Sequence, residues 1–223
     1  MNKWENFAIK NSEYYILTEN PYPFKTKEGK YYFFESGKRF FHSSYNEIKD
    51  LLKGNERVLE IGCGVGRLLL PHSRYFKEAV GVDISPTMIT KILQNAKELD
   101  IKNILTFQPH QAWDKLQYDY IYSYIVFQHI KEYSIITDYI KNISNCLYHG
   151  GVAQLQFDTR PKNILYSIRN IIPDFLLPKL QRSAIRRIRR DPKRLRELFA
   201  TNNLKLIKEL NPNSELHTFI LEK

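Results

Sequence analysis

Five residues in the first half of the chain have types and spacing suited to binding a nucleoside. A carboxylate is followed by three alternating glycines and, about 20 residues after them, by a second acid: Glu60, Gly62, Gly64, Gly66 and Asp83. Because glycine has no Cβ atom, the backbone at these positions can turn sharply and approach a ligand closely. A carboxylate at the position of Asp83 is placed to accept hydrogen bonds from the two hydroxyls of a ribose.

The charge of this segment separates two classes of ligand. A dinucleotide site has the pattern G-x-G-x-x-G, whose glycines approach a pyrophosphate. Here the spacing is G-x-G-x-G, and Glu60 stands two residues before the first glycine, where it would repel a phosphate and attract a cation. S-adenosylmethionine carries an ammonium and a sulfonium group and no phosphate. The segment Glu-Ile-Gly-Cys-Gly-Val-Gly resembles the first motif, E/D-x-G-x-G-x-G, of the class I S-adenosylmethionine-dependent methyltransferases.

This resemblance implies a role for each position. Glu60 and the backbone from Gly62 to Gly66 would hold the methionine end of the donor, and Asp83 would hold the ribose. In the family an apolar residue near the start of the next helix packs on the adenine, and the loop after the third strand usually offers it an acid or an amide. Met88 is the apolar residue at this position, with a place in the core as the alternative, and Gln108 is the residue whose amide would serve in a loop that has no carboxylate. The expected donor-binding residues are Glu60, Gly62, Cys63, Gly64, Gly66, Asp83, Ile84, Met88, Gln108, Ser123 and Val126.

A second informative stretch follows the fourth predicted strand, which we expect at 120–126. Ligands of open α/β sheets lie beyond the carboxyl ends of the strands, between the first and the fourth. This rule places Ser123, Val126, Phe127, Gln128 and His129 at the cleft. Many small-molecule methyltransferases have a similar segment that ends in H-I/V, and this chain matches it at His129 and Ile130.

His129 has two interpretations that the sequence leaves open. An imidazole titrates near neutral pH, so His129 is a candidate catalytic base that takes a proton from a substrate hydroxyl as the methyl group arrives. Alternatively, it is a structural residue that binds the backbone of the strand-to-helix turn.

The order of the predicted elements indicates the fold. Strands are expected at 57–61, 78–82, 104–107, 120–126, 152–157, 204–210 and 216–221. Helices are expected at 35–53, 67–76, 86–99, 133–147 and 192–200. The last two strands form a hairpin, which agrees with the sheet of the resembling family. We therefore expect an α/β, Rossmann-like seven-stranded sheet of order 3-2-1-4-5-7-6, with the last strand antiparallel and helices on both faces.

The first 50 residues follow no general pattern of the family. They are dense in aromatic residues, and we expect them to form a helical cap, with the methyltransferase domain at 51–223. The cap would either cover one edge of the sheet or roof the donor pocket. Two prolines, Pro21 and Pro23, should separate its two helices.

A basic amphipathic insertion is expected at about 161–190. Its apolar residues recur at helical spacing: Ile164, Leu165, Ile168, Ile171 and Ile172. From Lys162 to Arg194 the chain has ten basic and two acidic residues, so this segment holds +8 of the total charge of +10. Such a segment can contact an anion or an anionic membrane surface through Arg182–Arg190, cover a substrate cleft, pair with a second subunit, or simply pack over a sheet edge.

Composition bounds the remaining possibilities. The hydrophobic content of 43% is ordinary for a globular domain. We find no apolar run of about 18 residues and no signal-peptide segment, so we expect a cytoplasmic protein. The two cysteines, Cys63 and Cys146, provide neither a disulfide framework nor the spacing of a metal site.

These observations predict an enzyme that transfers a methyl group from S-adenosylmethionine to a nucleophile, with a hydroxyl of a small molecule or glycan as the first choice. Alignment of the donor and the nucleophile provides most of the catalysis, so no catalytic triad is required. One alternative is an RNA or protein methyltransferase that uses the basic segment 182–194. However, the D/N-P-P-Y/F motif typical of N-methylation is missing, and we do not expect a nucleic-acid partner. A third possibility is a non-catalytic protein that binds S-adenosylmethionine.

Overall fold

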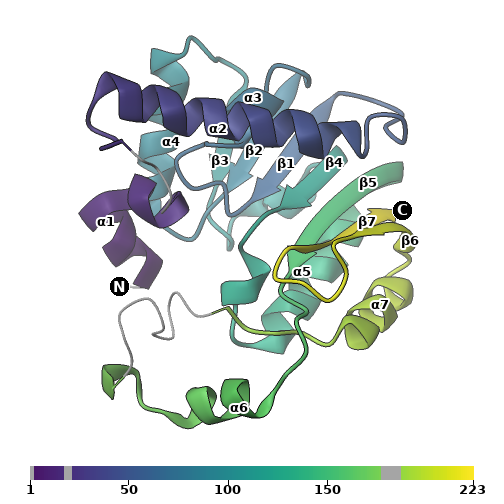
Figure 1. Cartoon of the computed structure of the whole chain (residues 1–223). Coiled ribbons are helices and arrows are strands. Elements are labelled where there is room, and N and C mark those ends of the chain that lie inside the picture. The colour runs from purple at the N-terminus through teal and green to yellow at the C-terminus, as the bar shows by residue number, and fades with distance from the viewer. Residues whose placement is uncertain (1–2, 18–21, 177–186) are drawn as a thin grey trace. The chain divides into compact units, whose positions relative to one another are not determined.

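The computed structural model describes residues 3–17, 22–176 and 187–223 (Figure 1). Within these ranges seven strands form one mixed sheet of order β3-β2-β1-β4-β5-β7-β6. The strands are β1 (Arg57–Ile61), β2 (Glu78–Val82), β3 (Ile104–Phe107), β4 (Tyr118–Ser123), β5 (Leu147–Phe157), β6 (Lys205–Leu210) and β7 (His217–Glu222). β1 pairs in parallel with β2 and β4, and β6 pairs antiparallel with β7. The predicted Rossmann-like fold class and strand order are confirmed.

The chain divides into two compact units. The first unit comprises Met1–Tyr122 with Cys146–Val152, and the second comprises Ser123–Asn145 with Ala153–Lys223. The helices of the first unit are α1 (Lys3–Ile16), α2 (Lys27–Asn46), α3 (Leu69–His72) and α4 (Pro86–Glu98), with a short η1 (Ala112–Lys115). The helices of the second unit are η2 (Phe127–His129), α5 (Tyr133–Cys146), α6 (Ile164–Ile171), η3 (Asp174–Leu176) and α7 (Pro192–Thr201). The domain boundary that we predicted at residue 50 differs from the boundary between these two units, and it stays a prediction.

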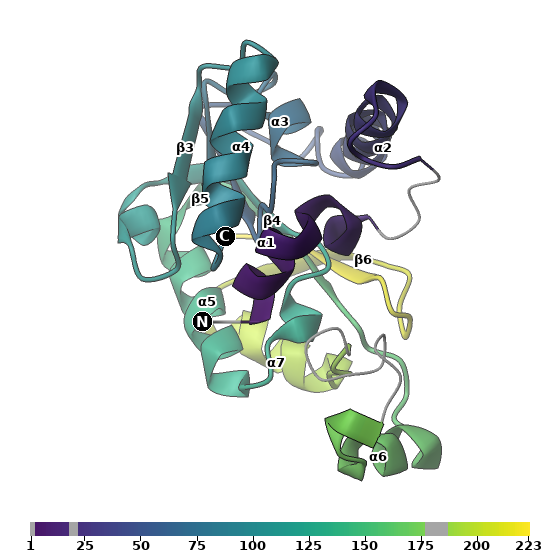
Figure 2. The same cartoon turned by 90° about the vertical axis from the view of Figure 1, so that its left-hand side faces the viewer.

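In the first unit the helices pack on the parallel strands. α3 contacts β1 and β2, α4 contacts β3, α2 contacts α3, and α1 contacts α4. Figure 2 shows α1 beside α4. β1, β2 and β4 are almost entirely buried, with the side chains of Val58, Leu59, Val80 and Val82 enclosed, whereas β3 is partly exposed. Because the buried parallel strands are covered on both faces, the loops that follow them begin from fixed positions.

The second unit has an aromatic core under its terminal hairpin. The ring of Phe157 stacks on that of Phe127 at 5.1 Å between centroids, and the ring of Phe199 meets that of Phe219 edge-on at 5.2 Å. Phe199 belongs to α7, which packs on β6. These contacts join β5, the hairpin and α7 into one body.

Two helix starts have a side-chain cap followed by a proline. The Ser85 hydroxyl accepts a hydrogen bond from Met88 N at 3.1 Å, and Pro86 opens α4. The Asp191 carboxylate accepts from Lys193 N at 2.9 Å at the start of α7. Because a side-chain acceptor satisfies a backbone N–H that has no partner in the first turn, these residues fix where each helix begins.

Two predicted helices have wrong boundaries. α2 begins at Lys27 instead of residue 35, because the Thr26 hydroxyl caps it by accepting from Gly29 N at 3.0 Å. It ends at Asn46 instead of residue 53. α3 spans only Leu69–His72 within the predicted range 67–76. After it the backbone continues in turns, in which Arg74 N donates to the carbonyl of Pro71 at 3.4 Å and Tyr75 N to that of His72 at 3.0 Å.

Two predicted strands also differ. β4 ends at Ser123 instead of residue 126, because Ile125 has a φ of +58° and a left-handed residue cannot continue a strand. β5 begins at Leu147 instead of residue 152 and passes through Gly150, whose φ of +78° glycine adopts without strain.

Candidate functional site

The three glycines after β1 all lie in the left-handed region of backbone space. Their φ angles are +79° at Gly62, +52° at Gly64 and +90° at Gly66. The N–H groups of Gly62 and Cys63 both donate to the carbonyl of Val82, at 2.7 and 3.1 Å, and Gly66 N donates to the carbonyl of Cys63 at 2.9 Å. The loop is thus held by its own backbone against the end of β2.

Asp83 ties the glycine loop to the start of α4. Its Oδ2 accepts from Gly64 N and its Oδ1 accepts from Ser85 N, each at 2.9 Å. Burial raises the pKa of Asp83 to about 6, although its backbone hydrogen bonds act in the opposite direction. The side chain is therefore mostly ionised at neutral pH. Each carboxylate oxygen has a second lone pair, which leaves acceptors for the hydroxyls of a ligand.

These bonds determine which ligand the loop can receive. The N–H groups at positions 62, 63, 64 and 66 all donate inside the protein. Helix-start sites that bind phosphate work because such N–H groups point at the anion. These four are already engaged, and the carboxylate of Asp83 lies beside them. The geometry favours a ligand without a phosphate, as the spacing of the glycines predicted.

Glu60 lies buried at the base of the loop, with 3% of its surface exposed. Its Oε2 accepts from the hydroxyl of Tyr122 at 3.0 Å, and the two residues are register partners on β1 and β4. Burial raises the pKa of Glu60 to about 8, while the Tyr122 hydroxyl and the Arg67 guanidinium lower it. Glu60 is therefore largely protonated at neutral pH, and a ligand cation nearby would favour its ionised form. Its predicted contact with the methionine end stays a prediction.

The other predicted residues of the first unit differ in how accessible they are. Cys63 is buried, and a Cβ added at Gly81 would lie 2.7 Å from its Sγ, so this side chain faces the core. Ile84 is 48% exposed. Met88 is buried in a cluster with Ala8, Phe33 and Val65, which is the core placement that the sequence left open. Gln108 is half-buried.

The start of α4 binds a carboxylate from α1. Glu5 accepts hydrogen bonds from the Ser85 hydroxyl, from Thr87 N at 3.2 Å and from the Thr87 hydroxyl at 2.5 Å. The Ser85 and Thr87 hydroxyls lower the pKa of Glu5, and a negative charge at a helix N-terminus is favourable. Nothing in the local sequence marks Glu5, because its partners stand about 80 residues away.

The end of α1 lies beside the glycine loop. A Cβ added at Gly64 would stand 2.7 Å from Cδ1 of Ile16. Lys91 on α4 donates to the carbonyl of Ala8 at 3.2 Å and to the hydroxyl of Ser12 at 2.6 Å. α1 is thereby held against α4 and the loop together, and a Cβ at Gly64 would displace the end of the Ile16 side chain.

The remaining predicted residues lie in the second unit. Ser123 is buried, and Val126 and His129 are half-buried. His129 N donates to the carbonyl of Val126 at 2.8 Å, which closes the turn of η2. The structural interpretation of His129 as a residue of this turn therefore has a backbone contact.

A chain of amides leads to the His129 side chain. Ile125 N donates to Oε1 of Gln156 at 2.6 Å, and Nε2 of Gln156 donates to the carbonyl of Glu215 at 2.6 Å and to Oε1 of Gln128 at 3.1 Å. Nε2 of Gln128 then lies 3.4 Å from Nε2 of His129. No sequence signal joined these residues.

The backbone ends of this chain determine how its amides are oriented. A backbone N–H can only donate and a carbonyl can only accept, so the Gln156 amide has one orientation and imposes one on Gln128. The NH₂ group of Gln128 therefore faces His129. A neutral imidazole that accepts this contact at Nε2 carries its proton on Nδ1.

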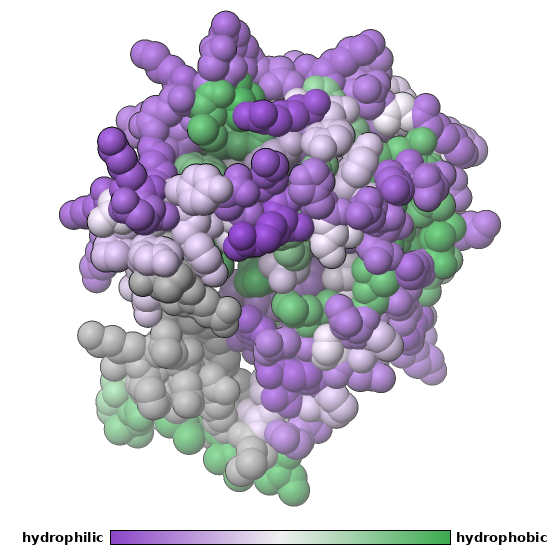
Figure 3. Space-filling view, turned by 45° about the horizontal axis from the view of Figure 1, so that its top comes forward, coloured by the Kyte–Doolittle hydropathy of each residue, from purple (hydrophilic) through white to green (hydrophobic). Residues whose placement is uncertain are grey.

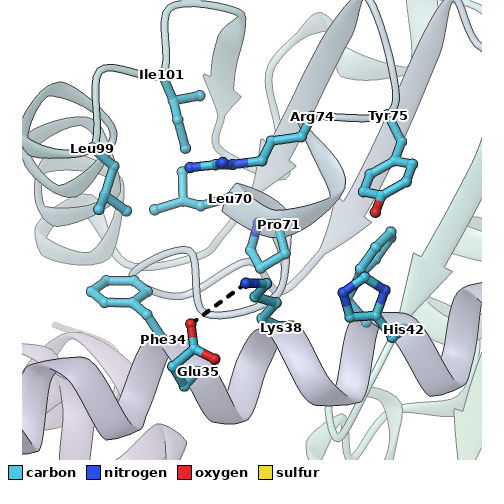
Figure 4. Close-up of a pocket in the computed structure, with 11 residues that line it drawn as sticks. Phe34, Glu35, Lys38, His42, Leu70, Pro71, Arg74, Tyr75, Leu99 and Ile101 are labelled. Atoms are coloured by element: carbon cyan, nitrogen blue, oxygen red, sulfur yellow. Dashed lines mark ion pairs between the residues drawn. The ribbon is translucent and has the colours of Figure 1, made fainter.

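A cavity of about 190 Å³ lies elsewhere in the first unit, away from the glycine loop (Figure 4). It is formed by α2, by α3 and the turn after it, and by the residues that follow α4, among them Phe34, Lys38, His42, Arg74 and Leu99. None of the predicted donor-binding residues lines it. The cavity is therefore not part of the candidate site.

Comparison with known proteins identifies the domain. Residues 59–153 match the family described as methyltransferase domain. The 23S rRNA (uracil(1939)-C(5))-methyltransferase RlmD of Histophilus somni is 34% identical over 77 residues, which are 31% of this chain and 18% of that protein. The chain spans less than a quarter of the length of the curated relatives that it matches first.

Solved structures agree in fold over the whole chain. An S-adenosylmethionine-dependent methyltransferase from Clostridium acetobutylicum superposes with a TM-score of 0.65 at 14% identity and covers 99% of both chains. The magnesium protoporphyrin IX methyltransferase from Synechocystis with bound S-adenosylhomocysteine superposes with a TM-score of 0.63 at 19% identity, covering 98% of this chain and 96% of that one. The matched methyltransferase domain, which includes the glycine loop, and the strand order 3-2-1-4-5-7-6 agree with the fold of the S-adenosylmethionine-dependent methyltransferases to which the chain is similar.

Proposed function

We propose that this chain transfers the methyl group of S-adenosylmethionine to a hydroxyl of a small molecule or glycan. The observation that supports this most is the glycine loop, whose N–H groups at 62, 63, 64 and 66 donate inside the protein beside two carboxyl groups. Such a loop suits a cationic donor without phosphate.

Different residues of the first unit bind different parts of the donor. Glu60 and the backbone of Gly62–Gly66 hold the methionine end, where the ammonium group favours an ionised Glu60. Asp83 accepts from the ribose hydroxyls with the lone pairs that Gly64 and Ser85 leave open. Ile84 packs on the adenine with its exposed face. Met88 and Gln108 support the same ring from the core and from the loop after β3.

Catalysis requires few groups from the protein. When bound, S-adenosylmethionine supplies a methyl group on a sulfonium that is already a reactive electrophile. The chain holds the acceptor oxygen in line with that methyl group, and such alignment can lower the barrier by about 7–11 kcal/mol. A base then takes the proton that the hydroxyl loses.

His129 is the residue that we assign as this base. Its Nε2 is the acceptor nitrogen, because the Gln128 amide that faces it is oriented by Gln156. A neutral imidazole with its proton on Nδ1 can accept the hydroxyl proton at Nε2 once the substrate replaces the long 3.4 Å contact with Gln128. Gln156 and Gln128 position this base without touching the substrate.

An acceptor screen tests the proposal. The chain is incubated with S-adenosylmethionine and sets of phenols, free sugars and sugar nucleotides, and S-adenosylhomocysteine is measured. We expect turnover with a hydroxyl acceptor, a loss of about 10²- to 10⁴-fold in His129→Gln with donor affinity retained, and wild-type behaviour in Asp50→Ala, which changes an exposed acid. Turnover only with amine, carbon or polymer acceptors, or full activity in His129→Gln, would contradict it.

RNA methylation is the second candidate. It is favoured by the partial similarity to RlmD and by the charge of +8 between Lys162 and Arg194. RNA binding would weaken with salt by about 0.7 log unit per log unit of salt for each phosphate contact to a single strand. Affinity for RNA oligonucleotides that does not change with salt, or no affinity, removes this candidate.

A further inference from the structure

We propose that α6 and the turn after it form a surface that docks on an anionic membrane. This α6 surface consists of four large apolar residues: Ile164 is 78% exposed, Ile168 51%, Phe175 76% and Leu176 65%. They fall within 13 residues of one segment. Exposed apolar residues occur singly on most soluble proteins, whereas a group of four indicates an interaction site.

The apolar residues of α6 lie on the opposite side of the helix from the residue that contacts the rest of the second unit. Ile164 and Ile168 are four residues apart and share one side of the helix. Tyr166 is about 200° around the helix from Ile164, on the opposite side. Its hydroxyl accepts from Arg189 N at 3.0 Å, and the Arg189 guanidinium lies 4.5 Å from its ring centroid. Tyr166 therefore anchors α6, and the two isoleucines face outward.

The start of the segment is fixed within the second unit. Asn163 caps α6 by accepting from Tyr166 N at 2.8 Å, and Arg189 donates to the carbonyl of Pro161 at 2.6 Å. Asp158 forms a parallel bridge with Arg189. α6 lies apart from α5 and α7 in both cartoon views (Figures 1 and 2), and hydrophobic atoms line the lower edge of Figure 3, where α6 lies in Figure 1.

The charge around this surface matches an anionic membrane. The segment from Lys162 to Arg194 carries +8, and α6 itself contains no acidic residue. Part of the expected contact through Arg182–Arg190 is engaged within the protein. Arg187 forms an ion pair with Glu215 at 2.6 Å, and Arg190 donates to the carbonyls of Ile130 and Lys131. Arg182 and Arg186 lie outside the described residues. Lys162, just before α6, is exposed.

A membrane suits this combination better than other partners. Short amphipathic helices bind in the interface when bulky apolar residues enter the headgroup region and nearby cations attract anionic lipids. RNA would use the charge without requiring exposed Ile164 and Phe175. Among the described ranges no helix has the length and hydropathy to cross a bilayer, so the contact would be peripheral.

Vesicle co-sedimentation tests this proposal with the full chain. The wild type should sediment with vesicles that contain phosphatidylglycerol and much less with pure phosphatidylcholine, and added salt should weaken the binding. Ile164→Ser combined with Ile168→Ser and Phe175→Ser should reduce binding at least tenfold. The matched control is Ile135→Ser, which changes a residue of α5 that is 42% exposed. It should bind like the wild type.

Three results would overturn the proposal. The wild type could fail to sediment with anionic vesicles, or the triple variant could bind as well as the wild type. Sedimentation velocity could also show a dimer that the triple variant dissociates, in which case a second copy covers the surface. Calorimetric donor binding by the triple variant checks its folding, and because vesicle binding needs no methyl donor, this test is independent of the proposed function.

Discussion

Glu60 allows the closest test of how the donor is held. With a pKa of about 8 in the free protein, about nine in ten Glu60 side chains carry a proton at pH 7. If the methionine ammonium comes to rest beside Glu60, the complex favours the carboxylate and the proton leaves. Binding at pH 7 should then release about 0.9 proton per donor.

The same linkage predicts how affinity depends on pH. A carboxyl that must lose its proton weakens binding by the factor 1 + 10^(pKa − pH), so the donor should bind about ninefold more tightly at pH 7 than at pH 6. Titration calorimetry in two buffers with different ionisation enthalpies measures the proton release directly. Glu60→Gln is the matched variant, because it keeps an acceptor for the Tyr122 hydroxyl but has no proton to lose.

Comparing the wild type with Glu60→Gln isolates the proton that Glu60 loses, because the donor ammonium and Asp83 titrate in both proteins. The wild type should release about 0.9 proton more than Glu60→Gln at pH 7. Equal proton release, or equal pH dependence of affinity, would refute the assignment of Glu60 to the methionine end and leave it as a structural partner of Tyr122.

Three further predictions follow from single side chains. Asp83→Ala should lower donor affinity in calorimetry at least tenfold, because hydrogen bonds to a carboxylate contribute about 1.5–3 kcal/mol each; affinity equal to that of Asp50→Ala would contradict this. Gly64→Ala should lower the free energy of unfolding in urea by about 1–3 kcal/mol, because its φ is +52° and the new Cβ would lie 2.7 Å from Ile16 Cδ1. An unchanged free energy of unfolding would contradict this prediction. Burial lowers the pKa of His72 to about 3, so its contribution to stability is complete above pH 6.5 and is lost as the pH falls towards 3. His72→Phe should therefore lose less stability than the wild type between pH 7 and 5, and parallel stability curves would refute this.

The donor loop was predictable because its signals are local. β1, the glycines, β2 and Asp83 lie within one stretch of the chain, and each residue type has few alternatives at such spacing. The capped helices α4 and α7 were predictable for the same reason, since Ser85 and Asp191 mark their own positions. The strand order followed from the sequence of elements together with the resemblance to a family of known topology.

The contacts around the loop were not predictable, because they join residues far apart in the chain. Glu5 reaches Ser85 across about 80 positions, and Gln156 orients Gln128 from another strand. The end of β4 was misplaced because Ile125 has a φ of +58°, a conformation that β-branched residues rarely adopt and that its type therefore does not signal. Whether Met88, Gln108, Ser123, Val126 and His129 meet the ligands as expected stays a prediction.

Binding of small molecules to the full chain, measured by calorimetry, tests the central claim most directly. S-adenosylmethionine and S-adenosylhomocysteine should each bind with one molecule per chain, and a nicotinamide dinucleotide should show no heat, because the loop's N–H groups at 62, 63, 64 and 66 are already bonded within the protein. Binding of the dinucleotide, or no binding of either adenosyl compound, would contradict the account.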